Sequence, residues 1–246
     1  MGGRIRVGVG GWVYEPWRGT FYPDGLRQKD ELAHLASRLT ATEVNATYYS
    51  SQKPATFAGW AKAAPDGFQF ALKASRYCTN RKVLGEAGES IQRFVGQGIV
   101  ELGDKLGPIL WQFMPTKRFD PDDFGAFLQL LPSSVDGVPL RHALEVRHES
   151  FDDPAFLDLA REAGAAVGLA DHAEYPAIKG HDVGFTYMRL MQTHADEATG
   201  YRNSAIATWA AKARDAATAG DVFAFFISGA KEKNPSAAEA MIVALK

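Results

Sequence analysis

Short apolar runs alternate along the chain with longer stretches in which apolar residues recur at helical spacing. The apolar runs, bounded by Gly, Pro and polar residues, predict strands at 5–10, 43–45, 68–73, 108–113, 142–146, 166–170, 185–189 and 222–227. The helically spaced stretches predict helices at 28–39, 54–64, 89–102, 121–131, 154–163, 205–219 and 236–245. Ser236 is expected to cap the last of these helices.

One interval breaks the alternation. Residues 172–184 contain Pro176 and carry no apolar stripe, so a loop is predicted there in place of a helix. Eight strands that alternate with about seven helices are typical of parallel βαβ units. In a chain of 246 residues without a linker or an internal repeat, this pattern favours one domain over residues 1–246, a closed (β/α)8 barrel of the TIM type. An open doubly wound sheet is the alternative.

The composition narrows the setting of this domain. Hydrophobic residues make up 46% of the chain and charged residues 23%, as in ordinary globular proteins. The net charge of −2 gives no global attraction to nucleic acid. A single cysteine, Cys78, excludes an internal disulfide, and no apolar run approaches the roughly 20 residues of a membrane span. A cytoplasmic protein with no membrane association is therefore expected.

Polar residues recur where the predicted strands end. In a TIM barrel the carboxyl ends of the strands surround the active site, and residues two apart on a strand share a face. Glu43 and Asn45 form one such pair, and Glu145 and Arg147 form another. The other strand ends contribute Lys73, Gln112, Asp171, Arg189 and Ser228. Acids and bases of this ring balance, which is suited to a pocket for a small polar ligand.

Aromatic residues gather in two loops beside this ring. Trp12, Tyr14 and Trp17 follow the first strand in a segment bounded by Gly and Pro, and Tyr49 follows the second. We expect these side chains to cover the mouth of the barrel and to contact a phosphorylated or carbohydrate-like ligand. A non-catalytic scaffold is the alternative, because charged networks at barrel mouths also orient loops.

The chain resembles the DUF72 (YecE-like) family of uncharacterised TIM-type barrels. Five segments that span nearly the whole sequence carry the resemblance: Gly8–Pro23 (GVGGWVYEPWRGTFYP), Thr42–Tyr49 (TEVNATYY), Phe68–Arg76 (FQFALKASR), Glu145–Phe151 (EVRHESF) and Tyr187–Arg189 (YMR). The resemblance implies a barrel with a polar mouth and no established activity.

The sequence departs from the family pattern in two places. The family usually has a His-Gly pair soon after the seventh-strand arginine, where this chain has Leu190–Gln192 after Arg189. It usually ends the eighth strand with asparagines, where this chain has Ile227–Gly229. An activity that needs those groups is therefore in question for this chain.

Three chemistries are compatible with the ring if the protein is an enzyme, which the sequence leaves open. Glu43 and Glu145 are candidates for an acid–base pair of a hydrolase, lyase or isomerase. Lys73 is a candidate for a Schiff-base amine, although a neighbouring carboxylate would hold it charged in an ion pair, which is the preferred interpretation. His148 with Glu145, and His172 with Asp171, are candidates for a divalent metal, but the sequence has no HExxH or CxxC motif, and no cofactor is predicted.

Nucleic-acid binding is the alternative function, and an endonuclease-like barrel is its catalytic form. Arg76, Tyr77, Arg81 and Lys82 form a basic and aromatic segment after the third strand, which Lys117 and Arg118 could extend. Phosphate contacts of such a patch would make binding strongly dependent on salt. The more usual interpretation of these residues is a solvated basic loop.

Overall fold

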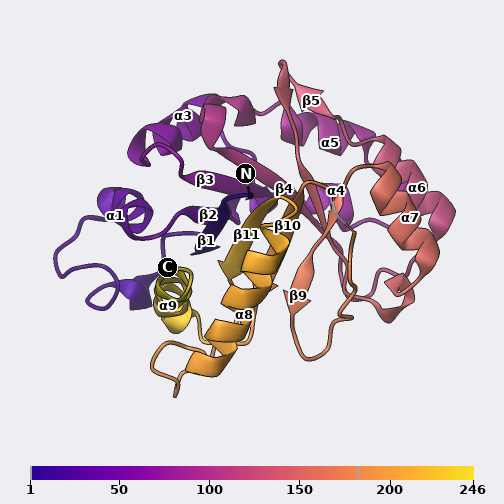
Figure 1. Ribbon diagram of the computed structural model, residues 1–246. Coiled ribbons are helices and arrows are strands. Elements are labelled where there is room, and N and C mark those ends of the chain that lie inside the picture. Colours follow the sequence, from indigo (N-terminus) through magenta and orange to yellow (C-terminus); the bar gives the residue numbers. More distant parts are fainter. Residues whose placement is uncertain (1, 182) are drawn as a thin grey trace.

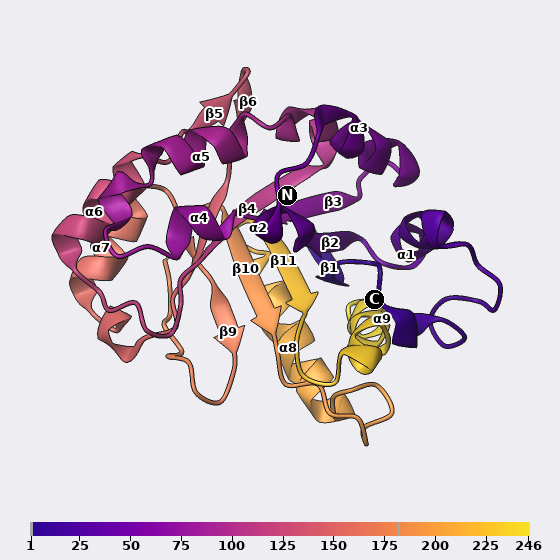
Figure 2. The same cartoon turned by 180° about the vertical axis from the view of Figure 1, so that it is seen from behind.

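The computed structural model describes residues 2–181 and 183–246 and shows a barrel of parallel strands surrounded by helices (Figures 1 and 2). This confirms the predicted TIM-type architecture. The strands of its sheet are β1 (Ile5–Gly10), β2 (Ala41–Val44), β3 (Gln69–Lys73), β4 (Leu106–Gln112), β7 (His142–Glu145), β8 (Ala166–Val167), β9 (Leu169–Asp171), β10 (Phe185–Leu190) and β11 (Asp221–Phe226). A separate two-stranded hairpin consists of β5 (Ser134–Val135) and β6 (Val138–Pro139).

Within the described residues the barrel sheet has nine strands, one more than predicted, in the order β8-β7-β4-β3-β2-β1-β11-β10-β9. The two ends of this order, β8 and β9, are separated in the chain by Gly168 alone and together replace the predicted strand 166–170. The first half pairs with β7 and the second with β10, so this segment brings the ends of the sheet together. A Cβ at Gly168 would lie 3.2 Å from the Leu144 carbonyl oxygen, which favours glycine at the division.

Helices form the outer layer of the barrel. They are α1 (Glu31–Arg38), α2 (Ala46–Tyr49), α3 (Pro54–Ala63), α4 (Arg76–Thr79), α5 (Gly88–Val95), α6 (Pro121–Gln129), α7 (Pro154–Glu162), α8 (Asn203–Ala216) and α9 (Asn234–Ala244). Short 3₁₀ segments lie at Glu15–Trp17, Gln28–Asp30, Leu84–Glu86, Ile99–Lys105, Glu149–Phe151 and Lys231–Lys233. None of the helices in the described ranges is both long enough and apolar enough to cross a membrane.

All seven predicted helices are present, with two differences in detail. The helix expected over 89–102 divides into α5 and a 3₁₀ segment, because Gly98 has a left-handed φ of 99°. The predicted cap at Ser236 is wrong, because α9 begins at Asn234 and Pro235 occupies its first turn. Between Asp171 and Phe185 the described residues form no helix, as expected for this loop.

Alternate residues of each strand point into the barrel, where small side chains let opposite strands approach. The interior cluster contains Ala41, Ala71, Leu110, Ala143, Ala166, Phe185, Tyr187, Phe223, Phe225 and Ile227. Gly8 of β1 pairs with Ala41, and a Cβ at Gly8 would lie 1.9 Å from the Ala41 carbonyl oxygen. This close contact explains why β1 carries glycine on its inner face.

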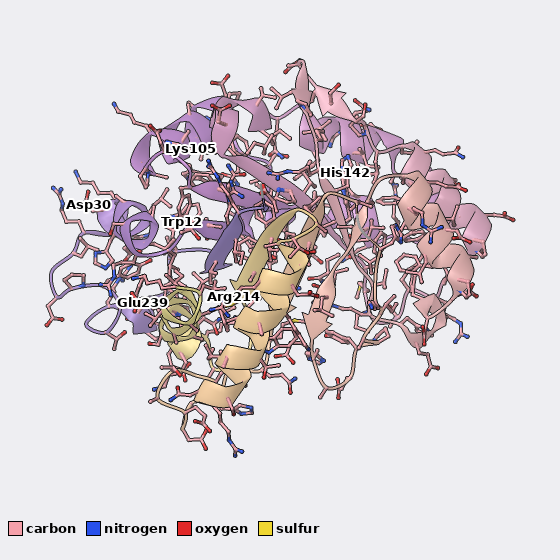
Figure 3. All side chains as sticks on the ribbon, viewed as in Figure 1. Trp12, Asp30, Lys105, His142, Arg214 and Glu239 are labelled. Carbon is pink, nitrogen blue, oxygen red and sulfur yellow. The ribbon has the colours of Figure 1, made fainter. Side chains whose placement is uncertain are left out.

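The outer face of the sheet packs against the helices in a larger aromatic core. Two polar side chains in this layer are paired: the Trp111 Nε1–H donates to His142 Nδ1 at 3.0 Å, and His142 Nε2 lies 2.8 Å from the Pro132 carbonyl oxygen. His142 lies beneath the helical layer (Figure 3), and burial lowers its pKa below the ordinary value. The imidazole of His142 is therefore neutral at pH 7, and it links Trp111 of β4 to Pro132.

The end of the barrel away from the site is closed by charged residues. Asp221 at the start of β11 accepts from Arg6 Nη1 at 3.0 Å and from Arg141 Nη1 at 3.3 Å. The Arg141 guanidinium also lies 4.8 Å from the centre of the Phe223 ring. These contacts tie β1, β11 and the residue before β7 together, so the opposite, carboxyl-terminal ends of the strands form the open mouth.

Candidate functional site

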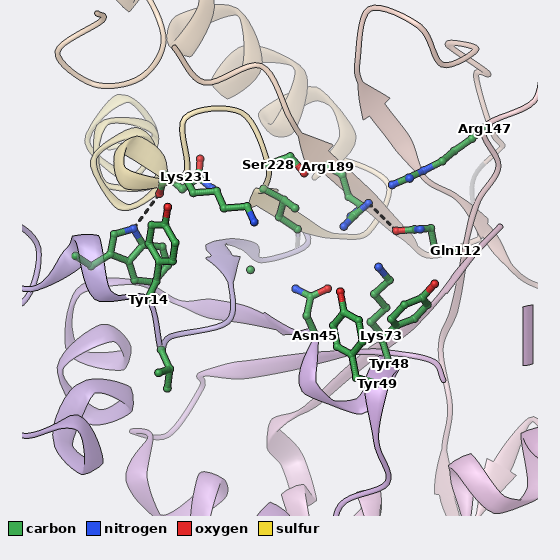
Figure 4. A pocket seen from close by; sticks show the side chains of 15 residues that line it. Tyr14, Asn45, Tyr48, Tyr49, Lys73, Gln112, Arg147, Arg189, Ser228 and Lys231 are labelled. Carbon is green, nitrogen blue, oxygen red and sulfur yellow. Dashed lines mark hydrogen bonds between the residues drawn. The ribbon is translucent and has the colours of Figure 1, made fainter. Parts of the chain in front are cut away.

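A pocket of about 490 Å³ opens at the carboxyl-terminal ends of the strands (Figure 4). It contains eight of the residues that the sequence predicts for the site: Tyr14, Trp17, Asn45, Tyr49, Lys73, Gln112, Arg147 and Arg189. It also contains Ser228, which the sequence predicts for the ring of strand ends, and residues that the prediction omitted: Gly10, Val13, Tyr48, Ile227, Lys231 and Asn234. The strand ends and the first two loops therefore meet as expected, and the segment after β11 completes the wall.

Glu43 lies in the wall of the barrel below the pocket and is bound by Arg189. The carboxylate accepts from Arg189 Nε at 3.0 Å through Oε2 and from Nη2 at 3.0 Å through Oε1, a two-pronged contact that also fixes the guanidinium plane. The Tyr187 hydroxyl donates to the same carboxylate at 2.8 Å. Burial and the Glu43 charge both raise the pKa of Tyr187 well above its ordinary value, so the phenol stays protonated and donates.

Glu145 lies on the other side of the same arginine. It accepts from Arg189 Nη1 and from Arg147 Nε, the latter at 2.5 Å. Burial alone would raise the pKa of Glu145, but the two guanidinium groups more than offset it and hold the pKa below the ordinary value. Glu145 is therefore an ionised acceptor between two arginines.

Glu43 and Glu145 are fully buried and do not belong to the residues described as lining the pocket. Arg189 and the two carboxylates join β2, β7 and β10 into one floor beneath it. Gln112 of β4 extends this floor, with its Oε1 3.5 Å from Arg189 Nη1. The contacts of Glu43 and Glu145 hold neighbouring strands together, and their predicted acid–base role stays a prediction.

Lys73 differs from the arginines in having no anionic partner. It is 8% exposed, yet among the described residues its Nζ makes no hydrogen bond and no ion pair. The expected ion pair with Glu43 or Glu145 is not formed, because the arginines occupy both carboxylates. The ammonium instead lies 4.1 Å from the centre of the Tyr48 ring.

The surroundings of Lys73 lower its pKa to about 8. Burial is the main cause and the nearby Arg189 charge the second, while Glu43 and Glu145 partly oppose them. A lysine in this state exchanges its proton close to neutral pH. Figure 4 shows its amino group directed into the pocket, towards Gln112 and Arg189.

The first aromatic loop forms the opposite wall. Trp17 is 2% exposed and donates from Nε1 to the Lys231 carbonyl oxygen at 2.9 Å, which links this loop to the segment after β11 (Figure 4). Tyr14 packs edge-on against Trp17 with ring centres 5.5 Å apart. The side chain of Lys231 is exposed and extends into the pocket beside them. Aromatic surfaces and a cation thus face Lys73 across the mouth.

Asn45, Tyr48 and Tyr49 line the wall next to β2. Asn45 directly follows β2 and is the N-cap residue of α2, and its backbone has helical φ and ψ angles, so the strand period no longer directs its side chain. The Tyr48 hydroxyl accepts from Asn80 Nδ2 at 2.9 Å, and Tyr49 is 64% exposed at the rim. Tyr48 is held in place, whereas Tyr49 has a free surface for a ligand.

Besides Glu43 and Glu145, four other predicted site residues lie outside the pocket lining. Trp12 packs against Trp60 of α3, with ring centres 5.2 Å apart, in the layer between the sheet and the helices. Asp171 accepts from Gln192 and from Tyr201, at 2.6 and 2.7 Å, so Gln192, which departs from the family pattern, holds the end of β9.

Of the other two residues, His148 stabilises a loop and Arg76 lies on the surface. His148 accepts through Nδ1 from the Ser150 amide at 3.1 Å and caps a 3₁₀ turn. Arg76 is exposed at the start of α4, with its guanidinium 5.4 Å from the centre of the Tyr77 ring.

The basic segment proposed for nucleic acid is partly occupied by internal contacts. Arg81 donates to the Glu86 carbonyl oxygen at 2.6 Å. Lys117 donates to the Lys82 carbonyl oxygen and to Asp123, both at 2.8 Å. These bonds hold the loops after β3 and β4 together, and nucleic-acid binding stays a prediction.

A metal site is not built around the predicted pairs. His172 Nδ1 accepts from the Glu174 amide at 3.1 Å, and its ring stacks on Tyr175. Among residues 2–181 and 183–246, no three His, Cys, Asp or Glu side chains are grouped so that they could hold an ion.

The profile of a family described as "Protein of unknown function DUF72" matches residues 6–246. UPF0759 protein YunF of Bacillus subtilis (strain 168) is 25% identical over 159 residues, 63% of this chain and 54% of YunF. The chain therefore aligns with about half the length of that relative.

Two solved structures of DUF72 family proteins share the fold. TM1631 of Thermotoga maritima MSB8 has a TM-score of 0.77 at 19% identity, covering 98% of this chain and 99% of that one. EF0366 of Enterococcus faecalis V583 has a TM-score of 0.76 at 18% identity, covering 98% and 95%. At these identities the likeness establishes a common architecture.

Proposed function

Because the chain belongs to the DUF72 family, whose description assigns no function, we propose a function from the mouth of the barrel: the pocket binds a small anionic molecule, such as a phosphorylated or carboxylated sugar-like compound. One observation carries the proposal. The cations among the described lining residues are Lys73, Arg147, Arg189 and Lys231, and no carboxylate stands beside them in the lining.

The charges below the pocket do not cancel this excess. Glu43 and Glu145 provide two negative charges, and Arg189 binds both of them. Arg147 shares Glu145, while Lys73 and Lys231 have no carboxylate partner among the described residues. An anion in the pocket would therefore meet two unpaired ammonium groups and a guanidinium that is 16% exposed.

The uncharged lining residues indicate the shape and polarity of the rest of the ligand. Tyr14 and Tyr49 offer aromatic surfaces, and Asn45 and Gln112 offer amides. This combination suits a compound with a flat or ring-shaped body and several hydroxyl groups. The cavity volume lies within the range of about 300–1,000 Å³ that is usual for small-molecule sites.

Isothermal titration calorimetry with glucose 6-phosphate, ribose 5-phosphate and the two unphosphorylated sugars tests the proposal. We expect the phosphate esters to bind and the neutral sugars to bind at least about tenfold more weakly, because a charge-assisted hydrogen bond contributes about 1.5–3 kcal/mol. Lys231→Gln and Arg147→Gln should each weaken binding about tenfold or more.

Arg161→Gln is the matched control. Arg161 is exposed on α7 and pairs with Asp158 on the surface, so its replacement should leave affinity unchanged. Equal binding of esters and neutral sugars, or equal loss of affinity in the control and in Lys231→Gln, would refute an anion site in the mouth.

A further inference from the structure

Lys73 is the one buried titratable group of the mouth whose charge the surrounding described residues leave unpaired. Other lysines of low exposure are used for structure. Lys105 donates to the Ala61 and Ala64 carbonyl oxygens at 2.8 and 2.7 Å, and Lys117 donates to Asp123. An amine that is buried, unpaired and open to a pocket has no evident role in stability.

We propose that Lys73 is a nucleophile that forms a Schiff base with a phosphorylated aldehyde or ketone bound in the mouth. The inference rests on the proposed function, since it takes the anion site as the anchor of the carbonyl compound. The geometry supports it in three ways: the amino group points into the pocket, both neighbouring carboxylates are held by arginines, and Lys231 and Arg147 lie in the same pocket for the phosphate.

The charges around Lys73 favour its neutral, nucleophilic form. Arg189 on β10 and Arg147 after β7 repel the ammonium, and burial removes its hydration. Glu43 on β2 and Glu145 on β7 favour the charged ammonium form. The Tyr48 ring of α2 also favours the ammonium form, through a cation–π contact. The balance lowers the pKa of Lys73 to about 8, so the free amine is present near neutral pH.

Formation of the imine needs only the amine and the carbonyl compound. The nitrogen lone pair of the neutral Lys73 amine attacks the carbonyl carbon, a C–N bond forms, and the carbonyl π electrons move to oxygen. Both amine protons pass to that oxygen, the C–O bond breaks, and water leaves to give the imine. The imine nitrogen then takes one proton from solvent, and the protonated imine withdraws electrons from the adjacent carbon, as Schiff-base lysines do in covalent catalysis.

Reductive trapping on the intact protein tests the inference. The protein is incubated with glyceraldehyde 3-phosphate and sodium cyanoborohydride, and labelled lysines are identified by peptide mass spectrometry. We expect Lys73 to be labelled at least tenfold faster than Lys105, Lys117 or Lys212, and inorganic phosphate to suppress this labelling. Glyceraldehyde without the phosphate should label Lys73 at least tenfold more slowly.

Two variants control the experiment. Lys73→Arg keeps the positive charge without a nucleophilic amine and should lose the preferential adduct. Lys231→Gln keeps Lys73 and should be labelled by glyceraldehyde 3-phosphate at a rate closer to that of glyceraldehyde. Labelling spread evenly over surface lysines, or unchanged total labelling in Lys73→Arg, would overturn the inference.

Binding of inorganic phosphate, measured by calorimetry on the same protein, separates the two proposals. Phosphate binding without a Lys73 adduct would overturn the Schiff base and leave the anion site standing. Labelling of Lys73 at equal rates by both aldehydes, with no phosphate binding, would instead overturn the anion site and the phosphorylated class of substrate.

Discussion

Arg189 and Lys73 are both buried cations at the mouth of the barrel, and their surroundings act on them in opposite directions. Burial would lower the pKa of Arg189, but Glu145 and Glu43 raise it above the ordinary value. Lys73 has no such partner, and burial with the arginine charges lowers its pKa to about 8. Arg189 therefore stabilises the folded chain, whereas the buried charge of Lys73 destabilises it. Residues at functional sites often lower stability in this way.

The residues of the inner face could be predicted from the sequence, but their pairing could not. The period of two placed Glu43, Lys73, Glu145 and Arg189 on one side of their strands, and the structure brings these residues together. The pairing depends on the stagger of the strands around the barrel and on the reach of each side chain. A guanidinium can bind two carboxylates at once, so Arg189 takes both and leaves Lys73 without either.

Replacing Lys73 by methionine should stabilise the protein at neutral pH. A folded-state pKa of about 8 against the ordinary 10.5 corresponds to a penalty on the order of 3 kcal/mol, less about 1 kcal/mol for the contact with Tyr48. The unfolded chain binds the extra proton, so the penalty is complete below pH 8 and disappears as the pH rises towards 10.5.

Urea unfolding of Lys73→Met and the wild type, measured from neutral pH to about pH 10, checks this expectation. The variant should be more stable at neutral pH, and the gap should narrow as the pH increases. A less stable variant at neutral pH would show that the lysine is favourably placed and would contradict its described surroundings.

The elements of the barrel follow the sequence pattern closely, with exceptions that have physical causes. Helices α2 and α4 were not predicted, because four residues are too few to show an apolar stripe. The sixth predicted strand divides at Gly168, where the chain passes close to the Leu144 carbonyl and changes its pairing from β7 to β10. A backbone contact of this kind leaves no mark in the hydrophobic pattern.

Arg189 is expected to hold β2, β7 and β10 together. Arg189→Met would leave Glu43 and Glu145 buried without this partner, which should destabilise the protein by about 3–5 kcal/mol, measured by urea unfolding at neutral pH. Arg161→Met, on the surface of α7, removes an exposed pair and should cost about 1 kcal/mol or less. Similar losses in the two variants would mean that the floor of the pocket does not brace the strands.

At the scale of the whole molecule, the barrel has two different ends. The amino-terminal end is closed by Asp221 with Arg6 and Arg141, and the carboxyl-terminal end opens into a cationic pocket. The barrel and its polar mouth could be predicted from the alternation of elements. The contribution of Lys231 could not, because the charged run at 231–233 is equally typical of a solvated turn, and the bond from Trp17 to the Lys231 carbonyl links this segment to the wall of the pocket.

The central claim is that the pocket at the mouth is an anion site, and an anomalous difference map from crystals grown with tungstate tests it most directly. Tungstate resembles phosphate in charge and shape and scatters strongly. We expect a peak in the pocket within hydrogen-bonding distance of Lys231 and Arg147, and we expect this peak to be lost in crystals of Lys231→Gln. Peaks at other sites with none in the pocket would contradict it.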